Sequence, residues 1–225
     1  MRPKIGITTG FREGSQIVDH HYVQAIETGG GIPILVPMVS QPETAAALAA
    51  LLDGLVIVGG PAVTKGLIGS LPSDLPETDP TRTESDGLIF EAVCVQQRPI
   101  LGICYGMQFI NAQRGGTIYA DVTVQRPESL THSADRGSHG HELNLIQGSR
   151  LRAFFEVEKL WVNSHHIQAV SALGEGLNAV GFAPDGVVEA LESMDGKLIG
   201  VQFHPERMLT QSAPFFHNFV NFCAG

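Results

Sequence analysis

The sequence predicts an α/β fold with a central, mostly parallel sheet that helices cover on both faces. The first two-thirds of the chain alternate short β-like runs with helical patterns, an order typical of parallel sheets. Residues 55–58 are almost continuously apolar, as expected of a strand buried on both faces. The last third contains closely spaced short strand patterns, which predict an added antiparallel region.

In the first two-thirds, strands are predicted at residues 5–8, 32–38, 55–58 and 100–103. Helical patterns follow them at residues 20–28, 43–52, 84–97 and 107–113. Gly29-Gly30-Gly31 ends the first helix as a glycine C-cap does. Residues 61–83 and 121–141 show no regular pattern, and loops of this length inside a domain are usually functional or mobile.

The last third contains strand candidates at residues 143–146, 160–162, 177–182, 187–192 and 198–203. Asp185-Gly186 and Asp195-Gly196 lie between three of them and are typical hairpin signals. A terminal helix over residues 214–222 directs its phenylalanines inward. The sequence contains no internal repeat and no linker, so we expect residues 1–225 to form a single domain.

Charge and cysteine content restrict the class of protein. The formal net charge of −9 disfavours nucleic acid and anionic membranes as partners, because both reward clustered Lys and Arg. Cys94, Cys104 and Cys223 cannot all pair, and their spacing fits neither a zinc cluster nor a disulfide framework. The N-terminus lacks the apolar run of a signal peptide, and no later run is long enough to span a bilayer. We therefore expect a cytoplasmic protein.

The sharpest local motif is Gly102-Ile103-Cys104-Tyr105-Gly106. A nucleophile between glycines, after an apolar strand and before a helix, fits a strand–turn–helix elbow. The helix N-terminus offers free N–H groups and a positive dipole end, which favour a thiolate and can stabilise an oxyanion. On this pentapeptide alone, a buried structural cysteine is an equally good interpretation.

Two further motifs follow predicted strands. In His204-Pro205-Glu206, extended geometry would turn both ionisable side chains to one side, where Glu206 could orient the imidazole of His204. By itself this motif is better explained as part of a solvated loop. Gly59-Gly60-Pro61 follows residues 55–58, and glycine there would let N–H groups approach a substrate oxygen, although a simple turn explains it equally. Together with the Cys104 motif, the two favour a catalytic site.

Taken in order, these motifs resemble the class I glutamine amidotransferases, and within them the γ-glutamyl-γ-aminobutyrate hydrolase-like peptidases. The resemblance spans nearly the whole chain. Its further segments are Tyr22-Val23-Gln24-Ala25-Ile26, Gly115-Gly116-Thr117-Ile118-Tyr119, Val162-Asn163-Ser164, Asp185-Gly186-Val187-Val188-Glu189-Ala190 and Gly200-Val201-Gln202-Phe203-His204-Pro205-Glu206. The resemblance implies the flavodoxin-like fold of that superfamily.

The resemblance also implies a reaction, the cleavage of a γ-glutamyl amide through a cysteine thioester with release of glutamate. Cys104 would be the nucleophile, His204 its base and then acid, and Glu206 the group that orients His204. The backbone N–H groups of Gly60 and Tyr105 would form the oxyanion hole. The reaction needs no metal or organic cofactor, and its only required partner is a small γ-glutamyl substrate.

Substrate-binding residues follow from the same resemblance. Gln108, one turn into the elbow helix, matches a glutamine that helps to hold the glutamyl group. Asn163, Ser164 and His165 lie in a loop that the family has near the α-amino and α-carboxylate groups of the substrate. The resemblance gives no role to Arg82 or to the loop over residues 132–141.

The chain departs from the hydrolase-like branch at several positions. Tyr105 stands where this branch often has Arg, and Pro61-Ala62-Val63 replaces an Asp-Val pair after Gly60; both resemble the synthetase-associated amidotransferases. The Arg-Asp of the branch appears as Arg82-Thr83, and its paired histidines as His166-Ile167. None of these positions belongs to the predicted triad, so the departures bear on the amine leaving group, which the sequence does not identify.

Three functions remain open at this point. The first is a free-standing hydrolase of γ-glutamyl amines or peptides. The second is a glutaminase subunit that delivers ammonia to a separate synthase, which Tyr105 and Pro61 favour. The third, a non-catalytic relative, is disfavoured by the intact Cys104, His204 and Glu206.

Two further expectations concern the other aromatic and histidine residues. Phe154-Phe155 or Phe215-Phe216 would mark a homodimer surface if exposed, although core packing is favoured for them. The remaining histidines match no familiar zinc spacing, so we expect structural or substrate-loop roles; they are His20, His21, His132, His139 and His141.

Overall fold

A computed structural model describes residues 1–225, apart from the side chain of Leu209. The helices in chain order are α1 (His20–Thr28), α2 (Pro42–Ala49), α3 (Pro80–Val95), α4 (Tyr105–Gln113), α5 (Val122–Gln125), α6 (Arg150–Phe155) and α7 (Leu209–Cys223). Two short 3₁₀ helices are η1 (Ala134–Arg136) and η2 (Pro205–Arg207).

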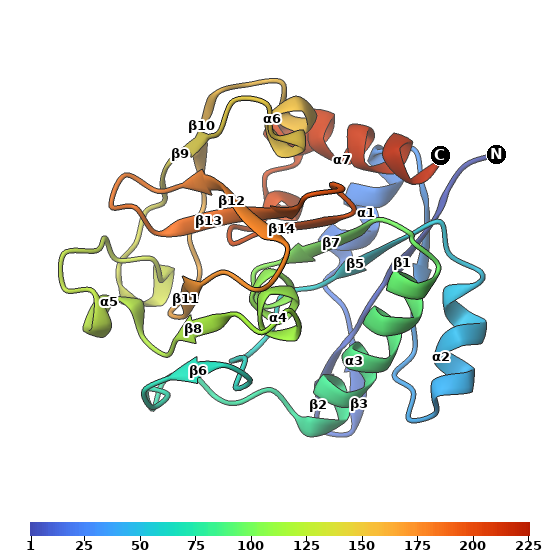
Figure 1. Cartoon of the computed structure of the whole chain (residues 1–225), viewed down its shortest axis with the longest axis horizontal. Coiled ribbons are helices and arrows are strands. Elements are labelled where there is room, and N and C mark those ends of the chain that lie inside the picture. The colour runs from blue at the N-terminus through green and yellow to red at the C-terminus, as the bar shows by residue number, and fades with distance from the viewer.

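The strands form one large sheet and one small hairpin (Figure 1). In chain order they are β1 (Lys4–Ile7), β2 (Gly10–Arg12), β3 (Ser15–Ile17), β4 (Ile32–Leu35), β5 (Gly54–Ile57), β6 (Leu67–Ile68), β7 (Ile100–Ile103), β8 (Thr117–Tyr119), β9 (His141–Leu145), β10 (Lys159–Val162), β11 (Ala169–Ala172), β12 (Leu177–Phe182), β13 (Val188–Ser193) and β14 (Leu198–Val201). The main path of the large sheet is β10-β9-β12-β13-β14-β7-β5-β1-β4, and β2 pairs only with β3.

The large sheet changes from parallel to antiparallel at β14. The pairs β14–β7, β7–β5, β5–β1 and β1–β4 are all parallel. Beyond β14, the pairs with β13, β12, β9 and β10 are antiparallel. This confirms the predicted α/β fold, with a parallel core and an antiparallel extension built by the last third of the chain.

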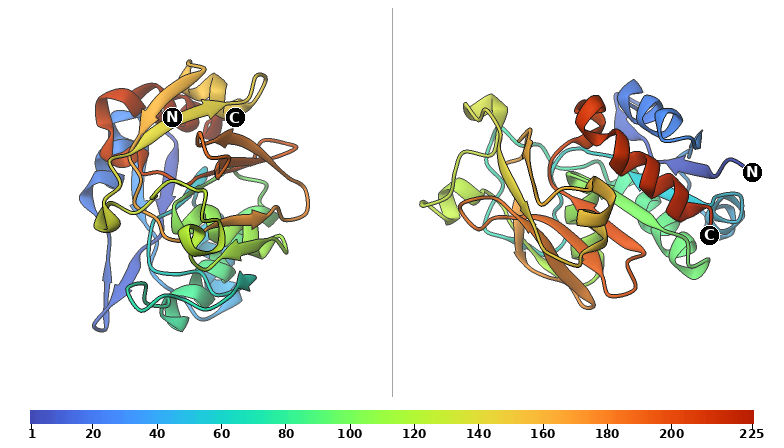
Figure 2. Two further views of the ribbon diagram at one scale, coloured as in Figure 1. Left: turned by 90° about the vertical axis from the view of Figure 1, so that its left-hand side faces the viewer. Right: turned by 90° about the horizontal axis from the view of Figure 1, so that it is seen from above.

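Helices cover both faces of the parallel strands, as predicted. On one face α1, α6 and α7 pack over β1, β7 and β14, and α1 and α7 lie side by side (Figure 2). On the other face α2, α3 and α4 pack over β5 and β7. The strands β5 and β7 are buried along their whole length because both of their faces are covered.

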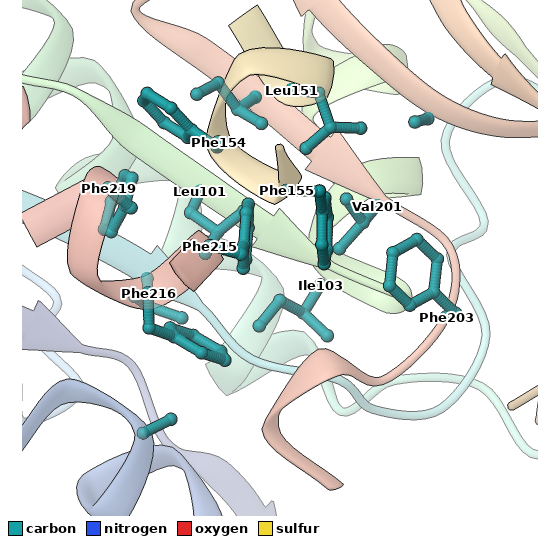
Figure 3. Packing of buried hydrophobic residues seen from close by; sticks show 14 of the residues in the cluster. Leu101, Ile103, Leu151, Phe154, Phe155, Val201, Phe203, Phe215, Phe216 and Phe219 are labelled. Atoms are coloured by element: carbon teal, nitrogen blue, oxygen red, sulfur yellow. The ribbon is translucent and has the colours of Figure 1, made fainter. Parts of the chain in front are cut away.

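Phenylalanines from α6 and α7 form the centre of the core between the sheet and the helices α1, α6 and α7 (Figure 3). The rings of Phe155 and Phe215 stack with centroids 4.6 Å apart and an interplanar angle of 4°. Phe154 and Phe216 are also buried. Core packing, the favoured interpretation of these residues, is thus confirmed, and the two Phe pairs provide no exposed dimer surface.

Some element boundaries differ from the prediction. Helix α3 begins at Pro80 rather than at residue 84, because Asp79 caps it by accepting from the N–H of Thr81 at 2.8 Å. Helix α7 begins at Leu209 and contains Pro214, which the sequence pattern had suggested as its start. The prediction omitted the short elements β2, β3, β6, β8, β11, α5 and α6, whose few residues show no clear helical or strand period.

The topology brings the three predicted motifs to one edge of the sheet. Strands β5, β7 and β14 are parallel neighbours, so their carboxyl ends lie side by side. Residues that follow such strands meet in the crevice above the sheet, where ligands bind in open α/β folds. Within the described part of the chain, no helix has the length and apolar character that a membrane crossing requires.

Candidate active site

Cys104 lies at a sharp turn between β7 and α4. It is the N-cap residue of α4 and has φ 53° and ψ −104°, a backbone conformation that non-glycine residues rarely adopt. Such strain persists only where the surrounding structure holds it, and it is typical of nucleophile elbows. The predicted strand–turn–helix elbow is therefore confirmed as a backbone geometry.

The two glycines of the elbow serve close packing. A side chain at Gly102 would overlap the backbone of Gly106, and one at Gly106 would overlap the carbonyl of Ile57 in β5. Neither glycine has a positive φ, so the turn itself is made by the strained Cys104. The glycines thus allow α4 to pack closely against β5 and β7, and this packing positions Cys104 at the carboxyl end of β7.

His204 and Glu206 follow β14, the neighbour of β7. The His204 Nδ1 and Glu206 Oε1 atoms lie 2.7 Å apart, and both residues are buried. The sequence interpretation assumed an extended segment, but residues 205–207 form the 3₁₀ turn η2. The turn, not strand alternation, brings the carboxylate to the imidazole. The predicted pairing is correct although its assumed geometry was wrong.

The environment of His204 favours the protonated imidazole. Burial by itself lowers the pKa of His204, but the charge of the neighbouring Cys104 sulfur and a hydrogen bond to it, together with Glu206, outweigh burial and raise that pKa to about 10. At neutral pH the imidazolium is therefore the stable form beside the Cys104 sulfur. An imidazolium next to the sulfur is the partner that activates a cysteine nucleophile.

The Gly59-Gly60 turn lies against the imidazole of His204. A Cβ at Gly59 would lie 2.8 Å from His204 Cε1, so only glycine leaves room for the ring. Among the hydrogen bonds of the described residues, no acceptor takes the backbone N–H of Gly60 or of Tyr105. Tyr105 is the first residue of α4, where a helix N–H has no partner within the helix. Both N–H groups thus remain available to an oxyanion.

Arg82, to which the sequence assigned no role, holds the Gly59-Gly60 turn through hydrogen bonds to its backbone. Its guanidinium donates to the carbonyls of Val58 at 2.8 Å and Gly59 at 3.1 Å. It also pairs with Asp86 at 3.1 Å, and the whole side chain is buried. Burial raises the pKa of Asp86 to about 6, although Arg82 opposes that rise. The i,i+4 spacing of Arg82 and Asp86 on a helix is the sequence signal that could have identified the pair.

Gln108 lies in the elbow helix one turn beyond Cys104 and is buried. Its Nε2 donates to the backbone carbonyl of Gln168 at 3.0 Å and to Gln202 Oε1 at 3.0 Å. These two bonds use both amide hydrogens, which leaves the Oε1 atom to accept from a ligand. This arrangement is consistent with the expected role of Gln108 in holding the glutamyl group.

The predicted substrate loop divides into residues with different partners. Asn163 donates to the carbonyl of His204 at 2.9 Å and accepts from the N–H of His204 at 2.8 Å. Ser164 is buried and donates to the carbonyl of His132 at 2.7 Å. The structure therefore ties both side chains to the protein backbone and away from the hollows that contain Cys104. His165 alone of the three lines those hollows.

Cys104 lies where two hollows adjoin. The inner hollow has a volume of about 120 Å³ and polar walls that include Gln108, Ser133 and Gln168. The outer cleft has a volume of about 720 Å³. Its walls include apolar and charged residues of the β2–β3 hairpin, of the segment that joins this hairpin to α1, and of η2, among them Phe11, Arg12, Val18, Asp19 and Arg207. A substrate bound at Cys104 could thus extend in two directions, one into the smaller hollow and the other into the larger cleft.

Comparison with known proteins identifies a matching family, similar curated proteins and a crystal structure with the same fold. The family described as Peptidase C26 matches residues 5–206. Protein NtpR of Enterococcus hirae is 33% identical, over 95% of this chain and 94% of its own. Gamma-glutamyl-gamma-aminobutyrate hydrolase PuuD of Escherichia coli is 30% identical, over 93% of this chain and 87% of its own. A Thermoplasma acidophilum crystal structure described as "a putative gmp synthase subunit a protein" matches the fold with TM-score 0.71 at 18% identity, covering 100% of this chain and 95% of that one.

Proposed function

This chain belongs to the Peptidase C26 family of the class I glutamine amidotransferase superfamily, and from that premise we propose that it hydrolyses γ-glutamyl amides through a thioester on Cys104. The proposed substrates are γ-glutamyl amines or peptides, with γ-glutamyl-γ-aminobutyrate as the reference compound. The observation that carries the proposal is the strained, buried Cys104 beside a His204 that Glu206 holds at 2.7 Å.

The acylation step begins with the Cys104 sulfur, which attacks the γ-carbonyl carbon as a thiolate. The carbonyl oxygen gains the electron pair and accepts from the N–H groups of Gly60 and Tyr105. The carbonyl re-forms as the C–N bond breaks, and the His204 imidazolium gives its proton to the leaving nitrogen. The products of this half-reaction are a γ-glutamyl thioester and a free amine.

Hydrolysis of the thioester completes the cycle. The neutral His204 takes a proton from water, whose oxygen attacks the thioester carbon from the side that the amine has left. The C–S bond then breaks, which restores the thiolate and the imidazolium and releases glutamate. Glu206 stabilises the imidazolium in both half-reactions and keeps its Nε2 directed towards the sulfur.

The two hollows support an assignment of the substrate ends. In this assignment the γ-glutamyl group occupies the inner hollow, where Gln108 Oε1 accepts from the α-ammonium group. The amine occupies the outer cleft, which Arg12 and Arg207 border. Arg12 or Arg207 would attract the carboxylate of an amine such as γ-aminobutyrate, although Asp19, Glu77, Asp79 and Asp135 also line the cleft and Arg207 pairs with Asp19 at 3.4 Å. The volume of the outer cleft supports a leaving group larger than ammonia.

The alternative function is a glutaminase subunit that delivers ammonia to a separate synthase. Pro61 and Tyr105 favour this function, because both resemble the synthetase-associated branch of the superfamily. In that case free glutamine would be the substrate, and the outer cleft would face the synthase. Both functions use the same triad, so they differ only in the leaving group and in the need for a partner.

The test is the release of glutamate by the purified chain from glutamine and from a panel of γ-glutamyl amines. We expect kcat/KM for γ-glutamyl-γ-aminobutyrate to exceed that for glutamine. Turnover of glutamine alone, and only with a synthase present, would overturn the proposal in favour of the alternative. The panel includes γ-glutamyl ethylamide, whose leaving amine is smaller than γ-aminobutyrate and carries no carboxylate.

A matched pair of cysteine variants tests the mechanism. Cys104→Ala should abolish turnover and should not form a mass adduct with a γ-glutamyl substrate, whereas Cys94→Ala should keep both. Cys94 is a suitable control because it is a free cysteine that lines a different hollow, away from Cys104. Turnover by Cys104→Ala at the wild-type rate would exclude the thioester route.

A further inference from the structure

Four buried side chains from four separate segments converge next to the antiparallel part of the sheet. They are His132 in a loop, His141 at the start of β9, His166 in the loop before β11, and Glu189 in β13. Each is at most 4% exposed. Within the described residues, the Nε2 atoms of His141 and His166 and both carboxylate oxygens of Glu189 have no hydrogen-bond partner. Buried polar atoms without partners are costly and call for a ligand.

The three distances from the Glu189 carboxylate to the imidazole nitrogens match the edges of a tetrahedral metal site. Glu189 Oε1 lies 3.2 Å from His166 Nε2, 3.4 Å from His132 Nδ1 and 3.4 Å from His141 Nε2. Zinc bonds of about 2.0–2.1 Å put neighbouring ligand atoms of a tetrahedron roughly 3.3–3.4 Å apart. All four ligand atoms lie within 4.8 Å of one another. The imidazole nitrogens would have to move towards one another, from separations of up to 4.8 Å to about 3.4 Å, to complete the coordination shell.

The outer nitrogen of each imidazole is engaged with an acceptor. His166 Nδ1 lies 2.9 Å from the carbonyl of Gln168, and His141 Nδ1 lies 3.2 Å from that of Glu142. In a neutral ring, the nitrogen opposite such an acceptor carries a lone pair, which here points towards Glu189. Hydrogen bonds of this kind orient the histidine ligands of metals in proteins.

His132 shows the same arrangement with a carboxylate. Its Nε2 lies 2.8 Å from Asp185 Oδ2, which leaves Nδ1 directed at the cluster. Ser164 Oγ is 3.3 Å from that Nδ1, but its hydrogen is used by the carbonyl of His132 at 2.7 Å. A divalent cation would balance the charges of Glu189 and Asp185 together. The cluster therefore has the ligands, the orientation and the charge of a closed cation site.

We propose that His132, His141, His166 and Glu189 bind a zinc ion in a closed, structural site. Three imidazoles with one carboxylate suit zinc and related first-row ions, whereas magnesium and calcium prefer oxygen ligands. All four ligands come from the protein and are buried, so the ion would hold structure and not carry out chemistry. The sequence prediction of no metal rested on spacing, and these ligands are dispersed over residues 132–189.

Such an ion would fix a wall of the inner hollow. His166 and its neighbours Ser133, His165 and Gln168 all line that hollow. The carbonyl of Gln168 accepts from His166 Nδ1 and also from Gln108 Nε2. The ion would therefore hold Gln108 and the loop of His165 in place through one backbone carbonyl. This structural role does not depend on the proposed reaction, because the ion would hold the residues that line the inner hollow and would not contact the substrate.

Without an ion, the cluster would be a network of charged hydrogen bonds. Burial lowers the pKa of His132, but Asp185 and Glu189 outweigh burial and raise it to about 9. A protonated His132 would then offset the charge of the Glu189 carboxylate. The metal site and the hydrogen-bonded network can be distinguished by measurement, since only the metal site binds an ion with fixed stoichiometry.

The experiment measures metal content in the full chain produced in zinc-supplemented medium. We expect about one zinc ion per chain in the wild type, in Cys104→Ala and in the control His139→Gln, and a loss of most of it in His141→Gln and Glu189→Gln. His139 is an exposed histidine two residues from His141. Retention of zinc by Cys104→Ala excludes binding at the thiolate, and full zinc in His141→Gln would overturn the proposal.

Two measurements on the wild type keep the test decisive if a variant fails to fold. Absorption at the zinc edge should fit nitrogen and oxygen neighbours near 2.0 Å with no sulfur, as expected for this ligand set. Removal of the ion with a chelator should lower the melting temperature, and zinc, but not magnesium, should restore it. A wild-type chain that contains no metal, and whose melting temperature does not respond to zinc, would show the hydrogen-bonded network instead.

Discussion

The guanidinium carbon of Arg82 lies 4.1 Å from the centroid of the Tyr105 ring. The same guanidinium binds the carbonyls of Val58 and Gly59. One buried side chain thus contacts both segments whose N–H groups would form the oxyanion hole. The ring of Tyr105 provides a surface on which Arg82 stacks.

Replacing Arg82 by lysine should lower kcat by about 10- to 100-fold, because small displacements of catalytic groups have effects of this size. Lysine keeps the charge, but it cannot bind two carbonyls and stack on Tyr105 at the same time. The measurement is steady-state kinetics together with a thermal unfolding curve. Arg98→Lys, an exposed position, serves as the control. A wild-type kcat in Arg82→Lys would mean that the Gly59-Gly60 turn is held by other contacts.

Gly60→Ala should lower kcat by roughly 10²- to 10³-fold, the usual effect of losing one oxyanion donor. An added methyl group would overlap the Arg82 guanidinium, so the turn and its N–H group would have to move. Gly87→Ala in α3 is the matched control, because a Cβ at Gly87 meets nothing within 4 Å. The control should retain activity and gain up to about 1 kcal/mol of stability from helix propensity.

The pKa of His204 should be near 10 in the free enzyme and should fall in Cys104→Ala and in Glu206→Gln. Each variant removes a negative group that raises the pKa against burial. The raised folded-state pKa stabilises the fold most below the unfolded value of about 6.5, and this contribution is lost as pH rises towards 10. Titration of the His204 ring by NMR measures the shift. Equal pKa values in all three proteins would contradict the ion pair.

Asn163→Ala should reduce kcat by about 10- to 100-fold and change KM little, since Asn163 holds the backbone of His204 on both sides. The sequence-based expectation of a direct substrate contact predicts the opposite, a raised KM with kcat retained. Steady-state kinetics with γ-glutamyl-γ-aminobutyrate distinguishes the two. Asn178→Ala, an exposed position on β12, is the control.

Arg207→Ala should raise KM for γ-glutamyl-γ-aminobutyrate by about 2- to 5-fold, the size expected for an exposed charge pair. KM for γ-glutamyl ethylamide should stay constant, because its amine carries no carboxylate. The measurement is a comparison of both substrates with wild type and variant. Equal changes for the two substrates would assign Arg207 to general support of η2 and not to the leaving group.

Several features of the site followed from local sequence, and others could not. The elbow at Cys104 was predictable because an apolar strand, flanking glycines and a helix are encoded within a few neighbouring residues. The pairing of His204 with Glu206 was also local, although the 3₁₀ turn that makes it was not foreseen. The contact between Asn163 and the His204 backbone spans 41 positions, and no short motif indicates it.

The sequence by itself determined the α/β class, the turn at Cys104 and the pairing of His204 with Glu206, because these depend on periodicity and on residues close together in the chain. Only the tertiary structure decided that β14 lies beside β7, that Arg82 supports the Gly60 turn, and that the histidine cluster gathers around Glu189. These contacts join segments tens of residues apart, and the free energy that selects them comes from burial of the whole chain.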